Sequence, residues 1–162
     1  MKTLRTCLII FALSIIAVTC KKDDEDFTQV SAFEKALHDE VNNYRATQGL
    51  NQLTLQFIMV KEAQAHARGR ANGTISAADV QSDMMTRWNT VESKLGVPNV
   101  SNEAYISTQI TTQTAAEVVA AWAADSVGKI ILDGDYTQSG PGTGTTSDGR
   151  TYIMHMFCKW TK

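Results

Sequence analysis

Apolar residues recur at helical spacing in three stretches of the first half of the chain, which predicts three helices. The first predicted helix begins at Ser31 and ends before Gly49, and its apolar stripe is formed by Phe33, Leu37, Val41 and Tyr44. The second covers about residues 56–71, and its many alanines favour close packing against a neighbouring element. The third begins near residue 76 and ends at Gly96.

The second half of the chain alternates between strand and helix patterns. Strands are predicted at residues 103–110 and 150–160, with a helix at 114–122. Residues 129–132 are predicted as a strand or an extended loop, and the glycine-rich residues 134–149 as a loop. Both faces of 150–160 are apolar, which is typical of a central strand that is covered on both sides. The order of elements therefore predicts an α+β fold with a sheet between helical layers.

Short local signals mark the ends of several elements. Ser31 and Glu34 have the spacing of a capping box, in which each side chain accepts a hydrogen bond from a backbone N–H at the start of the helix. Thr114 and Glu117 repeat this pattern at the start of the 114–122 helix. Asp148-Gly149 predicts a tight hairpin turn before the last strand.

Residues 1–19 have the pattern of an export signal. Two basic residues precede an uncharged apolar run at 7–18, which is shorter than the about 20 residues that a membrane-spanning helix needs. Residues 17–20 resemble a lipobox, the bacterial motif whose cysteine, here Cys20, receives a lipid. The alternative is a plain secretory signal followed by a cysteine without a lipid.

The residues after Cys20 favour a lipid-anchored protein. Residues 21–26 read Lys-Lys-Asp-Asp-Glu-Asp, a charged run that cannot pack and that resembles the surface-export signal of Bacteroidota lipoproteins. A simple hydrophilic tether is the alternative interpretation of this run. We expect a signal peptide at 1–19, a lipidated cysteine with its charged tether at 20–30, and one domain at 31–162. The expected location is the outer membrane, facing the cell surface or the periplasm, with the membrane contacted through the lipid on Cys20.

Composition and charge narrow the function classes. The chain has 43% hydrophobic and 20% charged residues and a formal net charge of -2, which suits a packed domain. Without residues 1–19, which carry two of the 15 basic residues and no acidic one, the charge is 13 minus 17, or -4. This mildly acidic balance argues against a nucleic-acid partner, which would require a clustered basic face.

Three blocks of sequence resemble the CAP superfamily, which contains the cysteine-rich secretory, antigen 5 and pathogenesis-related proteins. They lie, in the family's order, at residues 41–67, 116–122 and 134–157. The first contains Asn-Asn-Tyr-Arg and Ala-Gln-Ala-His-Ala, the second Glu-Val-Val-Ala-Ala-Trp, and the third Gly-Asp-Tyr-Thr followed by Gly-Arg-Thr-Tyr. The resemblance implies a three-layer α-β-α sandwich.

The resemblance also implies a cleft, which in the family usually holds two histidines and two glutamates that bind a divalent metal such as zinc. Glu103 and Glu117 stand near the two glutamate positions, but Ala77 and Gly128 occupy the histidine positions. A shift of one residue would put Lys129 at the second histidine position instead, and neither choice restores an imidazole. We therefore expect no catalytic residue, metal or cofactor, and we name Glu103, Glu117 and Lys129 as cleft candidates. Each has a plainer alternative: a helix cap for Glu117, a solvated carboxylate for Glu103, and a surface lysine for Lys129, which could also pair with either glutamate.

The remaining reactive residue types suggest structural roles. His38 lies beside Asp39 and is expected to be exposed, whereas His66 is expected to be packed or hydrogen-bonded. His155 is expected in the core or at the edge of the cleft, and Cys158 as a buried, unreactive thiol.

These observations predict a lipoprotein that carries a degenerate, non-catalytic CAP domain. Its expected partner is an extracellular ligand: a glycan, a peptide, a lipid or a protein. The alternative is a CAP-type hydrolase or peptidase with an atypical active site, because a fold does not by itself determine a function.

Overall fold

The computed structural model of the protein describes residues 29–96 and 99–161. The leader at 1–19, Cys20 and the charged run at 21–26 lie outside the described residues. The elements in chain order are α1 (Ala32–Thr47), β1 (Thr54–Leu55), α2 (Phe57–Ala71), α3 (Val80–Leu95), β2 (Val100–Ile110), α4 (Ala115–Ala124), α5 (Ser126–Leu132), β3 (Gln138–Thr145) and β4 (Thr151–Trp160). In the described ranges, no helix is both long enough and apolar enough to cross a bilayer.

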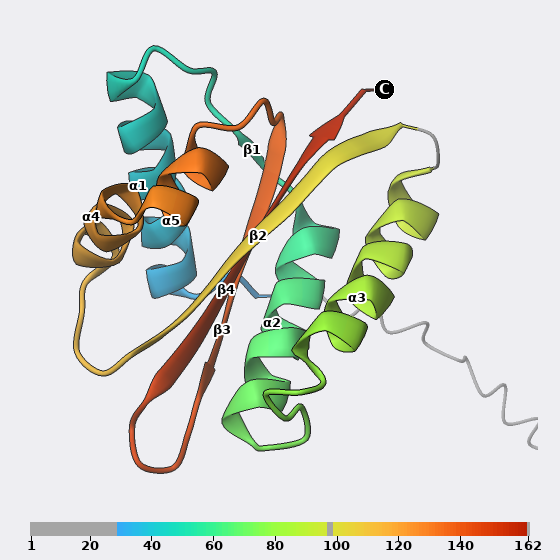
Figure 1. Cartoon of the computed structure of the whole chain (residues 1–162), viewed down its shortest axis with the longest axis vertical. Coiled ribbons are helices and arrows are strands. Elements are labelled where there is room, and N and C mark those ends of the chain that lie inside the picture. Colours follow the sequence, from blue (N-terminus) through green and yellow to red (C-terminus); the bar gives the residue numbers. More distant parts are fainter. Residues whose placement is uncertain (1–28, 97–98, 162) are drawn as a thin grey trace, which may run out of the picture.

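The four strands form one sheet in the order β1-β3-β4-β2. β1 pairs with β3 in parallel, and the other pairs are antiparallel. Helices α1, α4 and α5 cover one face of the sheet, and α2 and α3 cover the other (Figure 1). This arrangement confirms the α+β prediction and the three-layer α-β-α sandwich.

β4 is a central strand with a core on each side, as the sequence predicts. Ile153 and Phe157 are buried in the core formed with α1, α4 and α5. Met154, Met156 and Cys158 are buried in the second core, which α2 and α3 cover. Successive side chains of a strand point to opposite faces, so alternation along one strand supplies both cores.

The prediction of a loop for the whole of residues 134–149 is wrong, because residues 138–145 form β3. The glycines of this strand allow the backbone of α2 to approach the sheet closely. A Cβ atom on Gly140 would come within 2.6 Å of Met59, and one on Gly142 would overlap the backbone of Ala63 and Gln64. The fully buried Ala63 and Ala67 of α2 complete this tight contact. The strand therefore depends on its neighbours and not on side chains of its own.

The prediction of a strand or extended loop at residues 129–132 is also wrong, because these residues belong to α5. The side chain of Asp125 accepts a hydrogen bond of 2.8 Å from the backbone N–H of Gly128 and so caps the helix. At the other end, the buried Arg45 donates to the carbonyl oxygens of Leu132, at 2.7 Å, and Gly134, at 2.9 Å. Partners at both ends compensate for the low helix propensity of the β-branched residues in this segment.

Both predicted capping boxes are present. Glu34 accepts from the backbone N–H of Ser31 at 2.8 Å, and Glu117 accepts from that of Thr114 at 2.8 Å. The two boxes differ in burial, since Glu34 is 1% exposed whereas Glu117 is on the surface. β2 begins three residues earlier than predicted and contains a bulge at Asn102, whose φ of 52° is tolerated by asparagine.

Candidate functional site

The strongest candidate site is a cavity of about 390 Å³ between β2 and the α4–α5 corner. Four consecutive β2 residues, 105–108, form one wall. The other wall is formed by Ala121, Trp122, Asp125, Val127, Gly128 and Ile131. Val127 is 62% exposed at the rim, and the neighbouring Ile130 is 72% exposed. The cavity therefore combines apolar surface with a few polar groups, which is usual for ligand pockets.

Gly128 lines this cavity at the position where the family resemblance implies a histidine. A Cβ atom at residue 128 would lie 3.1 Å from the backbone carbon of Trp122 and closer still to its carbonyl oxygen. α5 therefore packs against α4 too closely for a side chain at this position. The structure therefore leaves no room for an imidazole at residue 128 in this packing of the two helices.

The three cleft candidates named from the sequence do not lie together, and none of them lines this cavity. Glu103 lies at the β2 bulge beside Glu92 of α3, and partial burial together with the hydrogen bond to Glu92 raises its pKa to about 7. Glu117 caps α4 at the surface, where hydrogen bonds from Thr114 lower its pKa. That Glu103 and Glu117 bind a ligand stays a prediction.

Lys129 pairs with Asp133 at 2.6 Å and donates to the hydroxyl of Tyr44 at 3.1 Å. These hydrogen bonds raise the pKa of Lys129. Lys129 is thus a surface lysine with partners in its own corner of the fold, and it is paired with neither glutamate.

Two histidines meet at one buried serine behind the cavity wall. Nδ1 of His38 lies 3.0 Å from Oγ of Ser139, and Nε2 of His155 lies 3.1 Å from the same oxygen. The expectation that His38 is exposed is wrong, because it is 7% exposed, and His155 and Ser139 are fully buried. A signal for the burial of His38 was present in the sequence and was missed. At helical spacing, His38 lies one turn after Glu34 and one turn before Asn42, on the same face of α1.

The hydrogen bonds of Asn42 determine which atoms of this cluster carry a proton. Asn42 accepts from the backbone N–H of Leu53 at 2.7 Å and donates to the carbonyl of Leu53 at 3.0 Å, which fixes the orientation of its amide. The amide nitrogen therefore donates to Nε2 of His38 at 3.2 Å, so that neutral His38 carries its proton on Nδ1 and donates to Ser139. The serine hydroxyl in turn donates to Nε2 of His155.

Burial lowers the pKa of both imidazoles in this cluster. For His155 the pKa is well below the ordinary value of 6.5, and neighbouring His38 adds to the effect. Both rings are therefore neutral at pH 7. Nδ1 of His155 and Nε1 of Trp122 are buried without a hydrogen-bond partner among the described residues.

The cluster lies directly behind the cavity. Ile106, which lines the cavity, is the β2 partner of His155 in β4. Trp122 also lines the cavity, and its ring contacts that of His155 edge-on, with 6.2 Å between the ring centroids. Ser139 itself is fully buried in β3, so its hydroxyl cannot contact a ligand in the cavity. The cluster supports the wall of the cavity and does not form its surface.

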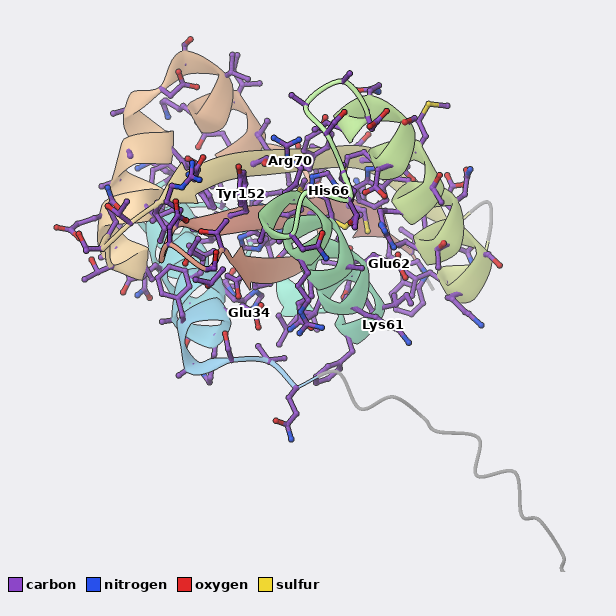
Figure 2. All side chains as sticks on the ribbon, turned by 90° about the horizontal axis from the view of Figure 1, so that it is seen from below. Glu34, Lys61, Glu62, His66, Arg70 and Tyr152 are labelled. Carbon is purple, nitrogen blue, oxygen red and sulfur yellow. The ribbon has the colours of Figure 1, made fainter. Side chains whose placement is uncertain are left out.

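His66 belongs to a separate ion-pair network between α2 and α3. It lies 2.6 Å from Asp83, which also pairs with Arg87, and Arg87 reaches Glu62 at 3.1 Å. Figure 2 shows Glu62 and His66 on consecutive turns of α2. The expectation that His66 is packed and hydrogen-bonded is confirmed, and burial lowers its pKa despite the bond to Asp83. This network holds α3 against α2.

The last reactive groups are the thiol of Cys158 and the side chains that could bind a metal ion. Cys158 is fully buried, as expected, and burial raises the pKa of its thiol to about 12. Within residues 29–96 and 99–161, no group of three or more His, Cys, Asp or Glu side chains is arranged to hold a metal ion.

Comparisons with known proteins agree with this architecture. The model of the cysteine-rich secretory protein family, CAP, matches residues 38–159. An outer surface protein of Borrelia burgdorferi has a similar structure, with a TM-score of 0.66 and 21% identity over 82% of this chain and 96% of that one. A search of curated proteins finds no match.

Two longer bacterial proteins contain the same fold as part of their chains. A cysteine-rich secretory protein of Staphylococcus aureus gives a TM-score of 0.55 at 13% identity, over 78% of this chain and 38% of that one. An extracellular SCP-domain protein of Bacillus anthracis gives 0.53 at 13% identity, over 78% and 40%. At these identities the likeness concerns the fold.

Proposed function

The chain belongs to the CAP family of cysteine-rich secretory proteins, and we propose that its CAP domain is displayed outside the cell, where it binds a ligand without catalysing a reaction. The observation that carries this proposal is the cavity between β2 and the α4–α5 corner, which offers apolar surface around Trp122 and polar groups from β2. The ligand is an extracellular glycan, peptide, lipid or protein.

Export and membrane anchoring rest on the N-terminal sequence. The leader at 1–19 ends at Cys20, and the charged run at 21–26 follows it directly. Two relatives of the same fold are described as an outer surface protein and an extracellular protein, which supports an exported location. We propose that the lipid on Cys20 holds the domain at the outer membrane, on the cell surface.

Metabolic labelling with a clickable fatty acid tests the anchor. The wild-type protein should take up label and fractionate with membranes, and Cys20→Ala should do neither. A labelled, membrane-bound Cys20→Ala protein would show that the anchor is elsewhere.

The proposal of a non-catalytic domain rests on the chemistry of the cavity wall. No lining side chain is an imidazole, and the single lining carboxylate, Asp125, accepts the hydrogen bond that caps α5. General acid–base catalysis needs a proton-transferring group within reach of the substrate. The wall is thus better suited to binding than to proton transfer.

A cavity-filling variant tests ligand binding. Ala121 and Ala120 are both exposed on α4, but only Ala121 lines the cavity. Ala121→Trp should fill the cavity, whereas Ala120→Trp adds the same ring outside it. Amide chemical shifts of the ¹⁵N-labelled protein would be followed during titration with separate pools of oligosaccharides, peptides and lipid micelles.

One pool should shift the amides of the cavity wall in the wild type and in Ala120→Trp, but not in Ala121→Trp. The proposal fails if no pool shifts these amides, or if Ala121→Trp responds like the wild type.

The hydrolase alternative rests on one specific contact, the hydroxyl of Ser139 between two imidazoles. A serine with an adjacent base is the arrangement of an activated nucleophile, but this one is fully buried. A fluorophosphonate probe, which labels accessible activated serines, should leave the protein unmodified. Labelling that disappears in Ser139→Ala would favour the hydrolase.

A further inference from the structure

β2 has a free edge. Among the strands of residues 29–96 and 99–161, it occupies the end of the sheet order and pairs with β4 alone. In Figure 1, β2 crosses in front of the other strands, between the two helical layers. The backbone N–H and C=O groups on its outer side are consequently available for pairing with another chain.

The last seven residues of β2 lack the features that usually protect an edge. Residues 104–110 contain no charge, no proline and no glycine, and their register with β4 is regular. The bulge lies before this segment, between Ser101 and Ala104. Natural edge strands are typically shortened, charged, bulged or covered, so an uncharged, regular segment of seven residues favours strand pairing.

The cavity follows this edge. Ile106 packs with the core under α4 and α5, whereas Tyr105 packs with the core under α2 and α3. Adjacent residues of a strand point to opposite faces, yet the cavity contacts all four residues from 105 to 108. A cavity that contacts consecutive residues of a strand reaches its backbone as well as the side chains of one face, so this cavity borders the backbone of the edge strand.

The charges near this edge restrict the partner. Glu103 lies at the start of the uncharged segment beside Glu92, and Asp125 lies at the cavity wall. No lysine or arginine lines the cavity, and Lys129 on α5 is paired with Asp133. Carboxyl groups at one end of the segment and at the cavity wall, with no basic side chain in the cavity lining, are complementary to a neutral or basic segment.

We propose that an extended, neutral-to-basic polypeptide segment of a partner protein binds along residues 104–110 as a fifth strand of the sheet. Its backbone pairs with the free groups of β2, and one of its apolar side chains enters the cavity beside Trp122 and Val127. In this mode main-chain hydrogen bonds supply affinity and side-chain pockets supply selectivity. The inference rests on the proposed ligand-binding function and names the class of ligand.

The test uses the purified full chain and a synthetic peptide of alternating valine and threonine flanked by lysines. Two isomers of this peptide carry N-methyl groups, one on its odd and one on its even residues. In a paired strand only one parity of N–H groups faces β2. One isomer should therefore bind at least about tenfold more weakly than the parent peptide, and the other should bind like the parent.

Hydrogen exchange and protein variants locate the binding. The parent peptide should slow exchange of the amides in 104–110. Ser107→Lys places a charge on the free edge and should abolish binding of the lysine-flanked peptide, whereas Thr112→Lys, beyond the end of β2, should not. Equal binding by both methylated isomers, or no binding, would overturn strand addition.

Two further outcomes distinguish the possible errors. If the free protein is a dimer whose 104–110 amides are already protected, a second copy occupies the edge and the partner assignment is wrong. If the peptide fails to bind but oligosaccharides or lipids still shift the cavity amides in an Ala121-dependent way, strand addition is wrong and the proposed function stands.

Discussion

Comparison of the two capping boxes can measure how much burial adds to the stabilisation that a capping glutamate provides. Glu34 and Glu117 occupy the same position in the first turn of α1 and α4, and each accepts from its cap residue. Glu34 is buried and accepts additional hydrogen bonds from Gln64 at 2.9 Å and from the backbone N–H and hydroxyl of Thr143, both at 2.8 Å. The substitution to glutamine, made in each box, changes a carboxylate to an amide of the same shape.

The expected loss for Glu34→Gln follows from these donors. One of the two oxygens becomes an NH₂ group, so at least one donor loses its acceptor on whichever side the NH₂ group lies. An unsatisfied buried donor costs about 1–3 kcal/mol, and hydrogen bonds to a charged group are worth about 1 kcal/mol more than neutral ones. The total is about 2–4 kcal/mol, a large part of the about 5–15 kcal/mol that stabilises a small domain.

Urea denaturation at pH 7 measures the difference between the two variants. For a slope of about 2 kcal/mol per M urea, Glu34→Gln should lower the midpoint by about 1 M or more. Glu117→Gln should leave it nearly unchanged, because glutamine still accepts from Thr114 at the surface. Thr114→Ala, which removes the cap hydroxyl, should cost about 0.5–2 kcal/mol. If Glu34→Gln lowers the midpoint no more than Glu117→Gln, the reasoning from buried donors is wrong.

Gly142→Ala should destabilise the protein by about 1–3 kcal/mol or more in thermal melts, because the new Cβ would overlap the α2 backbone at Ala63 and Gln64. Ser147→Ala in the exposed turn serves as a neutral control. If Gly142→Ala does not change the stability, the close packing of β3 against α2 is refuted. The free energy of unfolding should fall from pH 7 to pH 5, by up to about 1.4 kcal/mol per pH unit for each histidine. The reason is that burial lowers the folded-state pKa of all three histidines below 6.5. Between these pH values the unfolded chain therefore takes up protons that the folded chain does not. Glu103 acts in the opposite sense, since its pKa of about 7 lets the folded chain bind a proton before the unfolded one, so Glu103→Gln should steepen the fall. A profile that is flat in both the wild type and Glu103→Gln would contradict both assignments. Calorimetric titration with zinc should give no stoichiometric binding, because no group of three or more potential ligand side chains is arranged to hold a metal in the described ranges. A chelator-sensitive heat at low-micromolar affinity would show otherwise.

Much of the fold could be predicted because its signals are local. The capping boxes depend on residues three positions apart, and the alternation along β4 places its side chains in two cores whatever the neighbours are. The family resemblance supplied the layer order. The candidate site was less accessible, since the residues that line the cavity come from β2, α4 and α5 and carry no distinctive motif.

The errors arose where long-range contacts determine the conformation. His38 lies beside Asp39 and Glu40 in the sequence, yet it is buried because Ser139, 101 residues further on, provides its hydrogen-bond partner. Lys129 of α5 pairs with Asp133, the residue that follows this helix, and this pairing was missed because the segment was not predicted to be helical.

The sequence by itself therefore determined the capped helix starts, the central strand and the α+β class, because each depends on residue type at short spacing. Only the tertiary structure decided that residues 138–145 are a strand, that Gly128 has no room for a side chain, and that β2 ends the sheet with a cavity along its edge. Glycines have no side-chain periodicity of their own, so their conformation follows from the backbone that packs against them. A free edge is likewise a property of the strand order, which arises from pairing between distant segments, and the uncharged sequence of residues 104–110 does not reveal it.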